Sequence, residues 1–242
     1  TRSWRRRLRR LEGTMRWSSR GGVRWLEADL PGARAVFSTR SAGSVKESLV
    51  PLATALGLDP ERIVFAHQVH GANLVVHPRR GDEALEADGH VVREPGLAAL
   101  VFAADCLPIA LAGWGGVAIL HGGWRGLAAG IVARGAAAVE ATHAAVGPGI
   151  GPCCYEVGDE VHAAFAGLGE GIGAGRALDL PEVARRLLRE AGVGTIESAS
   201  LCTSCEADTF FSHRRDAGET GRQAGLVWIE TAEEGGAEPC RA

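Results

Sequence analysis

The feature that most constrains how this chain folds is an almost uncharged run, residues 97–120, in which Asp105 is the single charged residue. A membrane-spanning helix needs about 20 apolar residues, so the run is long enough to imitate one. However, Asp105 and Pro108 lie near its middle, and a central Asp costs roughly 2.5–3.5 kcal/mol on membrane-insertion scales. Glycines follow in the second half. The run therefore predicts two buried strands joined by a glycine turn rather than a membrane span.

The remaining sequence is typical of one globular domain of the α/β or α+β class. With 242 residues, 46% of them hydrophobic, the chain can bury a substantial core without disulfides. Its patterning predicts strands at residues 22–29, 34–40, 62–77 (in two pieces), 88–93, 98–105, 116–121, 144–150, 195–201 and 224–230. It predicts helices at residues 44–57, with Ser44 as cap and Gly57 as stop, and at 126–142, 158–167 and 181–191.

Net charge and the N-terminal residues narrow the range of partners. A formal net charge of -3 excludes a strongly basic nucleic-acid binder. Residues 1–14 carry six arginines ahead of Met15, and we interpret them as a non-native or disordered basic extension, with residues 15–242 as one catalytic domain. Since no signal peptide is visible, we expect a cytoplasmic protein with free thiols and no nucleic-acid or membrane partner. A monomer and a dimer both stay open.

Reactive residues gather in short islands of the sequence. One island holds His67 and His70, which point to opposite faces if they lie on a strand. Cys106 and His121 each follow or end an apolar strand. After His121, a Gly-Gly-Trp-Arg-Gly loop opens a predicted helix, and the backbone N–H groups there, with the guanidinium of Arg125, suit a phosphate group.

These islands together match a three-ligand metal site. Zinc accepts nitrogen and sulfur ligands, and catalytic zinc keeps one position open for water. Water bound there becomes a nucleophile near neutral pH. Spacing alone does not choose between His67 and His70. Cys202 and Cys205 also have metal-like CxxC spacing, but no second CxxC or CxxH pair accompanies them, so the sequence does not favour a structural zinc site there.

The ordered motifs resemble those of the YfiH/YlmD family, whose members have been described as multicopper polyphenol oxidases, or laccase-domain proteins, and as purine nucleoside phosphorylases. The resemblance is carried by QVHG, ADCLP, HGGWRG, GIGPCCYEV and FFSHRRDAGETGRQA, between about residues 34 and 230. It implies an α+β fold, a four-layer α/β/β/α sandwich with mixed β-sheets. It also implies a zinc site formed by His70, Cys106 and His121.

The activity that the resemblance implies is phosphorolysis of adenosine, inosine and methylthioadenosine, together with adenosine deamination. Two positions depart from the usual family pattern. Ala104 replaces the more usual Thr, and His213 replaces the more usual Tyr. Neither is a proposed ligand, but a histidine near the pocket could alter substrate range or response to pH.

Roles for the other polar residues follow from their chemistry. Arg40, Arg125 and Arg215 are candidates to bind phosphate, because guanidinium groups hold phosphate oxygens in pairs. Asp105 and Glu156 are candidates for proton transfer or for binding ribose hydroxyl groups. In the same scheme, Cys106 and His121 serve catalysis as metal ligands. The expected partners are purine nucleosides and phosphate.

Three alternatives remain. A copper-dependent laccase needs a trinuclear cluster rich in His-x-His pairs, and none of the eight histidines forms such a pair, although copper can replace zinc at a three-ligand site. A metal-free hydrolase would use Cys106 as nucleophile and His121 or His70 as base. An interaction protein would hold its metal without an open coordination position.

Overall fold

The structure is a computed structural model that describes residues 15–77 and 85–231. The extension predicted at residues 1–14 lies outside them. The first mixed sheet has the order β1 (Arg16–Arg20), β2 (Val23–Leu30), β3 (Ala33–Ser38), β14 (Gln223–Ile229), β7 (Ala98–Ala103) and β4 (Ile63–Val64). The second has the order β13 (Thr195–Ser198), β10 (Ala141–Val146), β8 (Leu107–Gly113), β9 (Gly116–Gly122), β6 (Gly89–Val92) and β5 (Leu74–His77).

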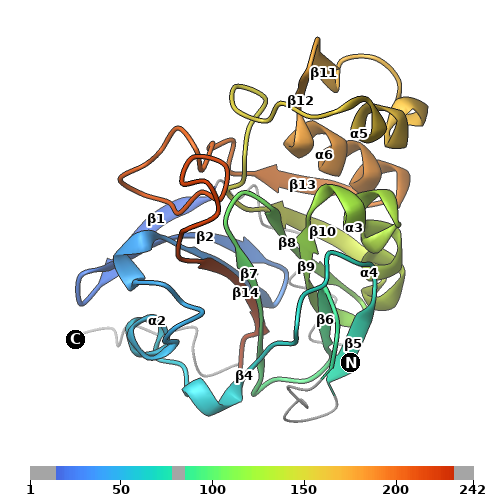
Figure 1. Cartoon of the computed structure of the whole chain (residues 1–242). Coiled ribbons are helices and arrows are strands. Elements are labelled where there is room, and N and C mark those ends of the chain that lie inside the picture. The colour runs from blue at the N-terminus through green and yellow to red at the C-terminus, as the bar shows by residue number, and fades with distance from the viewer. Residues whose placement is uncertain (1–14, 78–84, 232–242) are drawn as a thin grey trace, which may run out of the picture.

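Helices cover the outer faces of both sheets (Figure 1). The described helices are α2 (Val50–Leu56), α3 (Trp124–Ala128), α4 (Ile131–Val139), α5 (Asp159–Ala164) and α6 (Leu180–Glu190). Short 3-10 turns lie at Arg40–Ala42, Pro60–Arg62 and Ala166–Leu168, and a small hairpin is formed by β11 (Gly173–Ala174) and β12 (Ala177–Leu178).

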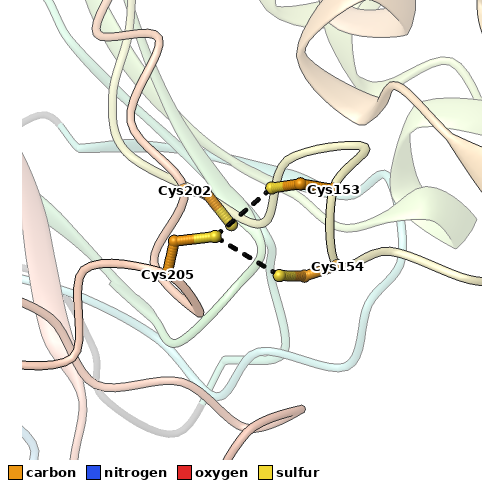
Figure 2. A group of neighbouring side chains, drawn as sticks. All are labelled: Cys153, Cys154, Cys202 and Cys205. Carbon is orange, nitrogen blue, oxygen red and sulfur yellow. Dashed lines mark hydrogen bonds between the residues drawn. The ribbon is translucent and has the colours of Figure 1, made fainter.

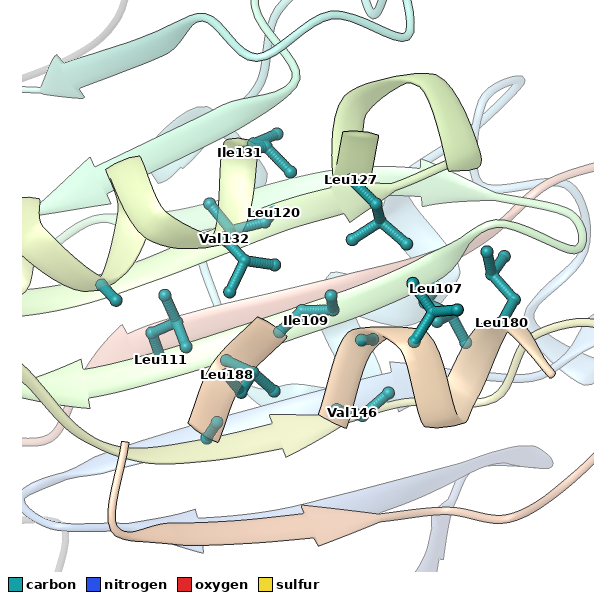
Figure 3. Packing of buried hydrophobic residues seen from close by; sticks show 14 of the residues in the cluster. Leu107, Ile109, Leu111, Leu120, Leu127, Ile131, Val132, Val146, Leu180 and Leu188 are labelled. Atoms are coloured by element: carbon teal, nitrogen blue, oxygen red, sulfur yellow. The ribbon is translucent and has the colours of Figure 1, made fainter. Parts of the chain in front are cut away.

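Three apolar layers hold this arrangement together. One packs α2 on the first sheet, a second lies between the two sheets, and the third packs α4 and α6 on the second sheet. Figure 3 shows this third layer, in which Ile131 of α4 and Leu188 of α6 belong to the same cluster as Ile109 and Leu120 of the strands. The α/β/β/α sandwich expected from the family resemblance is confirmed.

The uncharged run forms three strands, β7, β8 and β9, instead of the two predicted. In β8, Ile109 and Leu111 face the helices, while Ala110 and Ala112 face the other sheet. Both faces are buried, which explains why the run carries so little charge. Pro108 does not end the strand, because a proline near a strand's start removes a single ladder donor, and its carbonyl still accepts from Gly147.

The helix predicted at residues 44–57 begins later, at Val50, and ends at Gly57 as expected. Pro51 lies in the first turn of α2, where its missing N–H costs nothing, whereas in mid-helix it would break the ladder. Ser44 does not cap the helix; its hydroxyl accepts from the backbone N–H of Arg222 at 3.3 Å. The start of this helix was therefore wrongly predicted.

The helix predicted at residues 126–142 is divided into α3 and α4 by Gly130, whose φ of 86° is left-handed. The following strand begins at Ala141, earlier than predicted, because Glu140 ends α4 with a φ of 49°. Among the described residues, no helix is long and apolar enough to cross a membrane.

Candidate metal centre and adjoining cavity

Three potential metal ligands converge where β7, β8 and β9 meet the turn at residues 68–73. Their ligand atoms lie within 4.8 Å of one another: His70 in that turn, Cys106 just before β8, and His121 in β9. The rings of His70 and His121 meet edge to face, with centroids 4.7 Å apart. His121 is buried, Cys106 is half-buried and His70 is exposed, so the group is open on the His70 side.

His70 reaches this position through an unusual backbone conformation. It has a φ of 60°, in the left-handed region that non-glycine residues seldom adopt. The carboxylate of Asp88 accepts from the backbone N–H groups of Val69 (3.1 Å), His70 (2.9 Å) and Gly71 (2.7 Å), and so holds the turn. The expected strand through residues 67–70 is therefore wrong, and strand alternation is not what separates His67 from His70.

Asp88 also orients the second imidazole. The Nδ1–H of His121 donates to its carboxylate at 2.7 Å, which leaves Nε2 of that ring for the site. Burial would raise the pKa of Asp88, but the hydrogen bond from His121 and those from backbone N–H groups outweigh it, so this pKa lies below its ordinary value. Sequence reasoning missed Asp88. The signal available was the rule that a metal-binding histidine donates its other nitrogen to a carboxylate or carbonyl.

The Cys106 thiol and the His121 imidazole favour each other's charged forms. Burial alone would raise the pKa of Cys106, but His121 and His70 outweigh it and bring this pKa to about 6. Burial likewise would lower the pKa of His121, yet Cys106 and Asp88 bring it to about 9. A deprotonated thiol beside two imidazoles is the donor set that zinc accepts.

Gly123 leaves room for such an ion. A Cβ at this position would lie 3.1 Å from Cδ2 of His70 and 3.2 Å from Sγ of Cys106, tighter than almost all real contacts. The absence of a side chain therefore keeps the space between the ligands free. Together with the nitrogen and sulfur donors, this cradle fits a metal ion.

The metal-ligand group lies in the wall of a cavity of about 990 Å³. Ligand pockets usually measure about 300–1,000 Å³, and they are lined mainly by apolar and aromatic side chains. Phe65, Phe102, Trp124 and Tyr155 line this one, and residues 45–50, which lead into the first residue of α2, form another part of the wall. The cavity is therefore large enough for a nucleoside.

The two predicted acid–base residues lie in different places. Asp105 lines the cavity, has a φ of 89°, and is nearly buried. Its carboxylate accepts from the hydroxyl of Thr203 at 2.6 Å and from the backbone N–H of Arg214 at 2.7 Å. Glu156 is exposed and does not line the cavity. The structure therefore brings Asp105, but not Glu156, next to the ligands.

The three arginines predicted to bind phosphate also lie in different places relative to the cavity. Arg125 lines the cavity, with its guanidinium 4.5 Å from the centre of the Trp124 ring, and within the described residues it makes no hydrogen bond or ion pair. Arg40 is exposed outside the cavity and donates to the carbonyl of Ala207. Arg215 is also outside, held by Asp216 and by backbone carbonyls. Arg125 is thus the predicted arginine that is free to meet a ligand.

Four further charged residues line the cavity, none of them among the three arginines chosen for phosphate from the sequence. They are Lys46, Glu47, Arg214 and Arg222. Arg214 and Arg222 already donate to backbone carbonyls. His213, noted as a departure from the family pattern, is also in the wall. No motif or spacing marks Lys46, because it lies in an irregular segment.

Comparison with known proteins gives consistent matches over most of the chain. The family described as multi-copper polyphenol oxidoreductase laccase matches residues 36–230. A purine nucleoside phosphorylase of Deinococcus radiodurans is 40% identical over 203 residues, 78% of this chain and 79% of its own. Purine nucleoside phosphorylase YfiH of Escherichia coli is 35% identical over 188 residues, 72% of this chain and 77% of its own.

Solved structures agree with the fold. YlmD from Geobacillus stearothermophilus has a TM-score of 0.77 at 30% identity, over 90% of this chain and all (100%) of that chain. YfiH from Bacillus licheniformis has a TM-score of 0.75 at 31% identity, over 85% of this chain and 96% of that chain.

Proposed function

The chain belongs to the YfiH/YlmD laccase-domain family, and on that premise we propose that it is a zinc-dependent purine nucleoside phosphorylase with adenosine deaminase activity. Its substrates under this proposal are adenosine, inosine and methylthioadenosine. The observation that carries the proposal is the convergence of His70, Cys106 and His121 in the wall of a nucleoside-sized cavity. The names of the curated relatives support the nucleoside and phosphate substrates.

Zinc is the proposed metal, with copper as a possible replacement. Two imidazoles and one thiolate are borderline ligands that suit both ions, and copper outranks zinc in affinity. A zinc ion held by three protein ligands supplies an electrophilic centre and lowers the pKa of water. Asp88 keeps both histidines in position for it.

The chain's own residues account for binding of the two substrates. We assign the purine to the aromatic part of the cavity, where the Phe65 and Phe102 rings pack edge to face at 5.3 Å. We assign phosphate to Arg125 and to the backbone N–H groups that begin α3, which have no partner inside the helix. In phosphorolysis, a phosphate oxygen bonds to the anomeric carbon, and the bond from that carbon to the purine nitrogen breaks.

Asp105 serves as a positioning residue in this scheme. Both of its carboxylate oxygens accept hydrogen bonds from the protein, one from Thr203 and one from Arg214. It therefore ties three segments of the cavity wall together instead of transferring a proton. Glu156 has no contact with the substrate in this assignment.

A second function is favoured by one observation. The pKa of Cys106 is lowered to about 6 beside His121, against the effect of burial, which is what a metal-free cysteine hydrolase needs. Chelation separates the two proposals. Removal of metal should abolish the phosphorylase, whereas a hydrolase with a free Cys106 thiolate would keep its activity or gain some.

The test is incubation of the purified protein with adenosine, with and without phosphate, followed by chromatography of the products. Adenine and ribose 1-phosphate should appear together and only with phosphate, while inosine should form without it. Cys106→Ala should lose both activities. Adenine release that is independent of phosphate, or no product at all, would contradict the proposal.

A further inference from the structure

A second group of potential metal ligands lies outside the cavity. Cys153 and Cys154 lie in the loop after β10, and Cys202 and Cys205 lie in the loop after β13. Figure 2 shows the four side chains pointing toward one another from the two loops. Their sulfur atoms all lie within 4.8 Å of one another.

The sulfur spacing matches a tetrahedral metal site. Zinc–sulfur bonds of about 2.3 Å at tetrahedral angles place sulfur atoms about 3.8 Å apart. Here Sγ of Cys205 lies 3.4 Å from that of Cys153 and 3.5 Å from that of Cys154. A disulfide requires about 2.05 Å. The four thiols are therefore arranged around a common centre and not as bonded pairs.

Two hydrogen bonds from backbone N–H groups, one of them to a thiol, bring the two loops together. The backbone N–H of Thr203 donates to the carbonyl of Gly149 at 3.0 Å. The backbone N–H of Gly151 donates to Sγ of Cys202 at 3.3 Å, a hydrogen bond that favours a thiolate. A Cβ on Gly151 would lie 3.3 Å from Cβ of Cys202 and 3.5 Å from Sγ of Cys153, so glycine allows this close approach.

We propose that Cys153, Cys154, Cys202 and Cys205 bind one structural zinc ion. Four thiolates close the coordination shell, which distinguishes a structural site from a catalytic site with an open position. Binding is not a redox step: the four thiols release their protons to solvent, and each sulfur donates an electron pair to the ion. The inference does not depend on the proposed enzyme activity.

The position of this ion gives it a mechanical role. Cys154 precedes Tyr155, which lines the cavity, and Cys202 precedes Thr203, which donates to Asp105. The guanidinium of Arg214 donates to the carbonyl of Cys154 at 3.3 Å. An ion that joins the two loops would therefore help to hold Tyr155 and Asp105 in place in the wall of the cavity.

The first test is zinc content after purification under reducing, anaerobic conditions. The wild-type chain should hold about two zinc ions, one for each ligand group. Cys106→Ala and Cys202→Ser should each hold about one, and the double variant none. The matched control is Ser204→Ala, which changes a residue between Cys202 and Cys205 without removing a thiol and should keep the wild-type content. Zinc content of Cys202→Ser equal to that of the control would overturn the proposal.

A second test needs no change in the four cysteines, so it stands even if Cys202→Ser does not fold. X-ray absorption of zinc in Cys106→Ala should show sulfur ligands alone, at about 2.3 Å. Nitrogen ligands, or a metal-free Cys106→Ala protein, would overturn the proposal. So would a mass loss of two hydrogen atoms per cysteine pair under anaerobic conditions, because it would show that the thiols form disulfides.

Failure of this inference is distinguishable from failure of the proposed function. If the chain does not process nucleosides but Cys106→Ala keeps a zinc ion with four sulfur ligands, the structural site stands. If nucleosides are processed and Cys202→Ser loses no zinc, the structural site falls and the proposed function stands.

Discussion

At the scale of single residues, the candidate site depends on one carboxylate that is neither in the group of three ligands nor in the cavity wall. Asp88 holds the left-handed turn of His70 through backbone N–H groups and fixes the imidazole of His121 through Nδ1. One side chain therefore positions two of the three ligands. Removal of the Asp88 carboxylate should therefore lower the affinity for the metal.

Asp88→Asn should weaken zinc binding by about 10–100-fold, because a partner of metal-binding histidines typically contributes that much. The amide loses the negative charge that His121 faces. Affinity measured by competition with a chelator tests this. Asp59→Asn is the control, because Asp59 caps a 3-10 turn elsewhere and should leave the affinity unchanged. Equal affinities in both variants would contradict the assignment.

His70→Ala should abolish zinc binding at the three-ligand site, whereas His67→Ala should retain it. His67 also lines the cavity, but it is not in the group of three ligands. Metal analysis in a Cys202→Ser background isolates this site. Retention by His70→Ala with loss by His67→Ala would mean that the other histidine is the ligand.

Arg125→Ala should slow phosphorolysis by about 10–150-fold, because a lost charge-assisted hydrogen bond costs roughly 1.5–3 kcal/mol. Deamination uses water in place of phosphate and should fall less. Arg40→Ala is the matched control, since Arg40 lies outside the cavity. The ratio of the two product rates is the measurement, and an equal loss of both would place Arg125 on the nucleoside.

At this scale, the ordered motifs of the sequence identify potential ligands that the structure brings together. The ligand group His70, Cys106 and His121 that the family resemblance implies does come together. The residues alone do not decide between His67 and His70, since the turn that Asp88 holds replaces the strand expected there. Asp88 was missed because its contacts reach back along the chain to a turn that no local pattern predicts. Arg125 lines the cavity and Arg40 does not, a difference that depends on tertiary packing.

At the scale of elements, strands and helices with strong apolar patterning were predicted well, and their limits less so. The helix predicted at 181–191 is α6, and the strand predicted at 224–230 is β14. The start of α2 and the break at Gly130 were missed, because proline and glycine chemistry competes there with apolar periodicity. The CxxC spacing of Cys202 and Cys205 is a local signal in the loop after β13, but nothing local predicts that Cys153 and Cys154 of the loop after β10 lie beside them.

Capping of α6 provides a test at this scale. The side chain of Asp179 accepts from the backbone N–H of Glu182 at 2.9 Å, and so caps the helix. Asp179→Ala should lower the free energy of unfolding by about 0.5–2 kcal/mol, while Asp179→Asn should retain most of it. Chemical denaturation measures both. An unchanged stability in the alanine variant would show that packing alone determines where α6 begins.

At the scale of the whole molecule, the arrangement of histidines argues against a laccase. Of the eight histidines, His77 and His90 are buried and hydrogen-bonded to each other. Nε2 of His77 lies 3.0 Å from Nδ1 of His90. Within the described residues, no group of potential ligands contains more than two histidines. A blue-copper site together with a trinuclear cluster needs many more.

Protein loaded only with zinc should therefore show no oxidation of phenolic dyes, since zinc has no redox chemistry. Absorbance of the oxidised dye measures this, with a copper-loaded sample in parallel. Activity in the copper sample alone would report copper at the three-ligand site. Turnover by copper-free protein would refute the assignment of a zinc enzyme.

The place of β14 has a consequence for how the protein is made. β14 pairs with β3 on one side and β7 on the other, yet it is the last strand of the described chain. At about 5–20 residues per second, a ribosome needs roughly 10–40 s to travel from the end of β3 to β14. During that interval both neighbours present unpaired backbone groups. A chain cut short before Gln223 would therefore expose the edges of β3 and β7, whose unpaired backbone groups can pair with other chains. Chaperones and proteases would have to recognise such a chain.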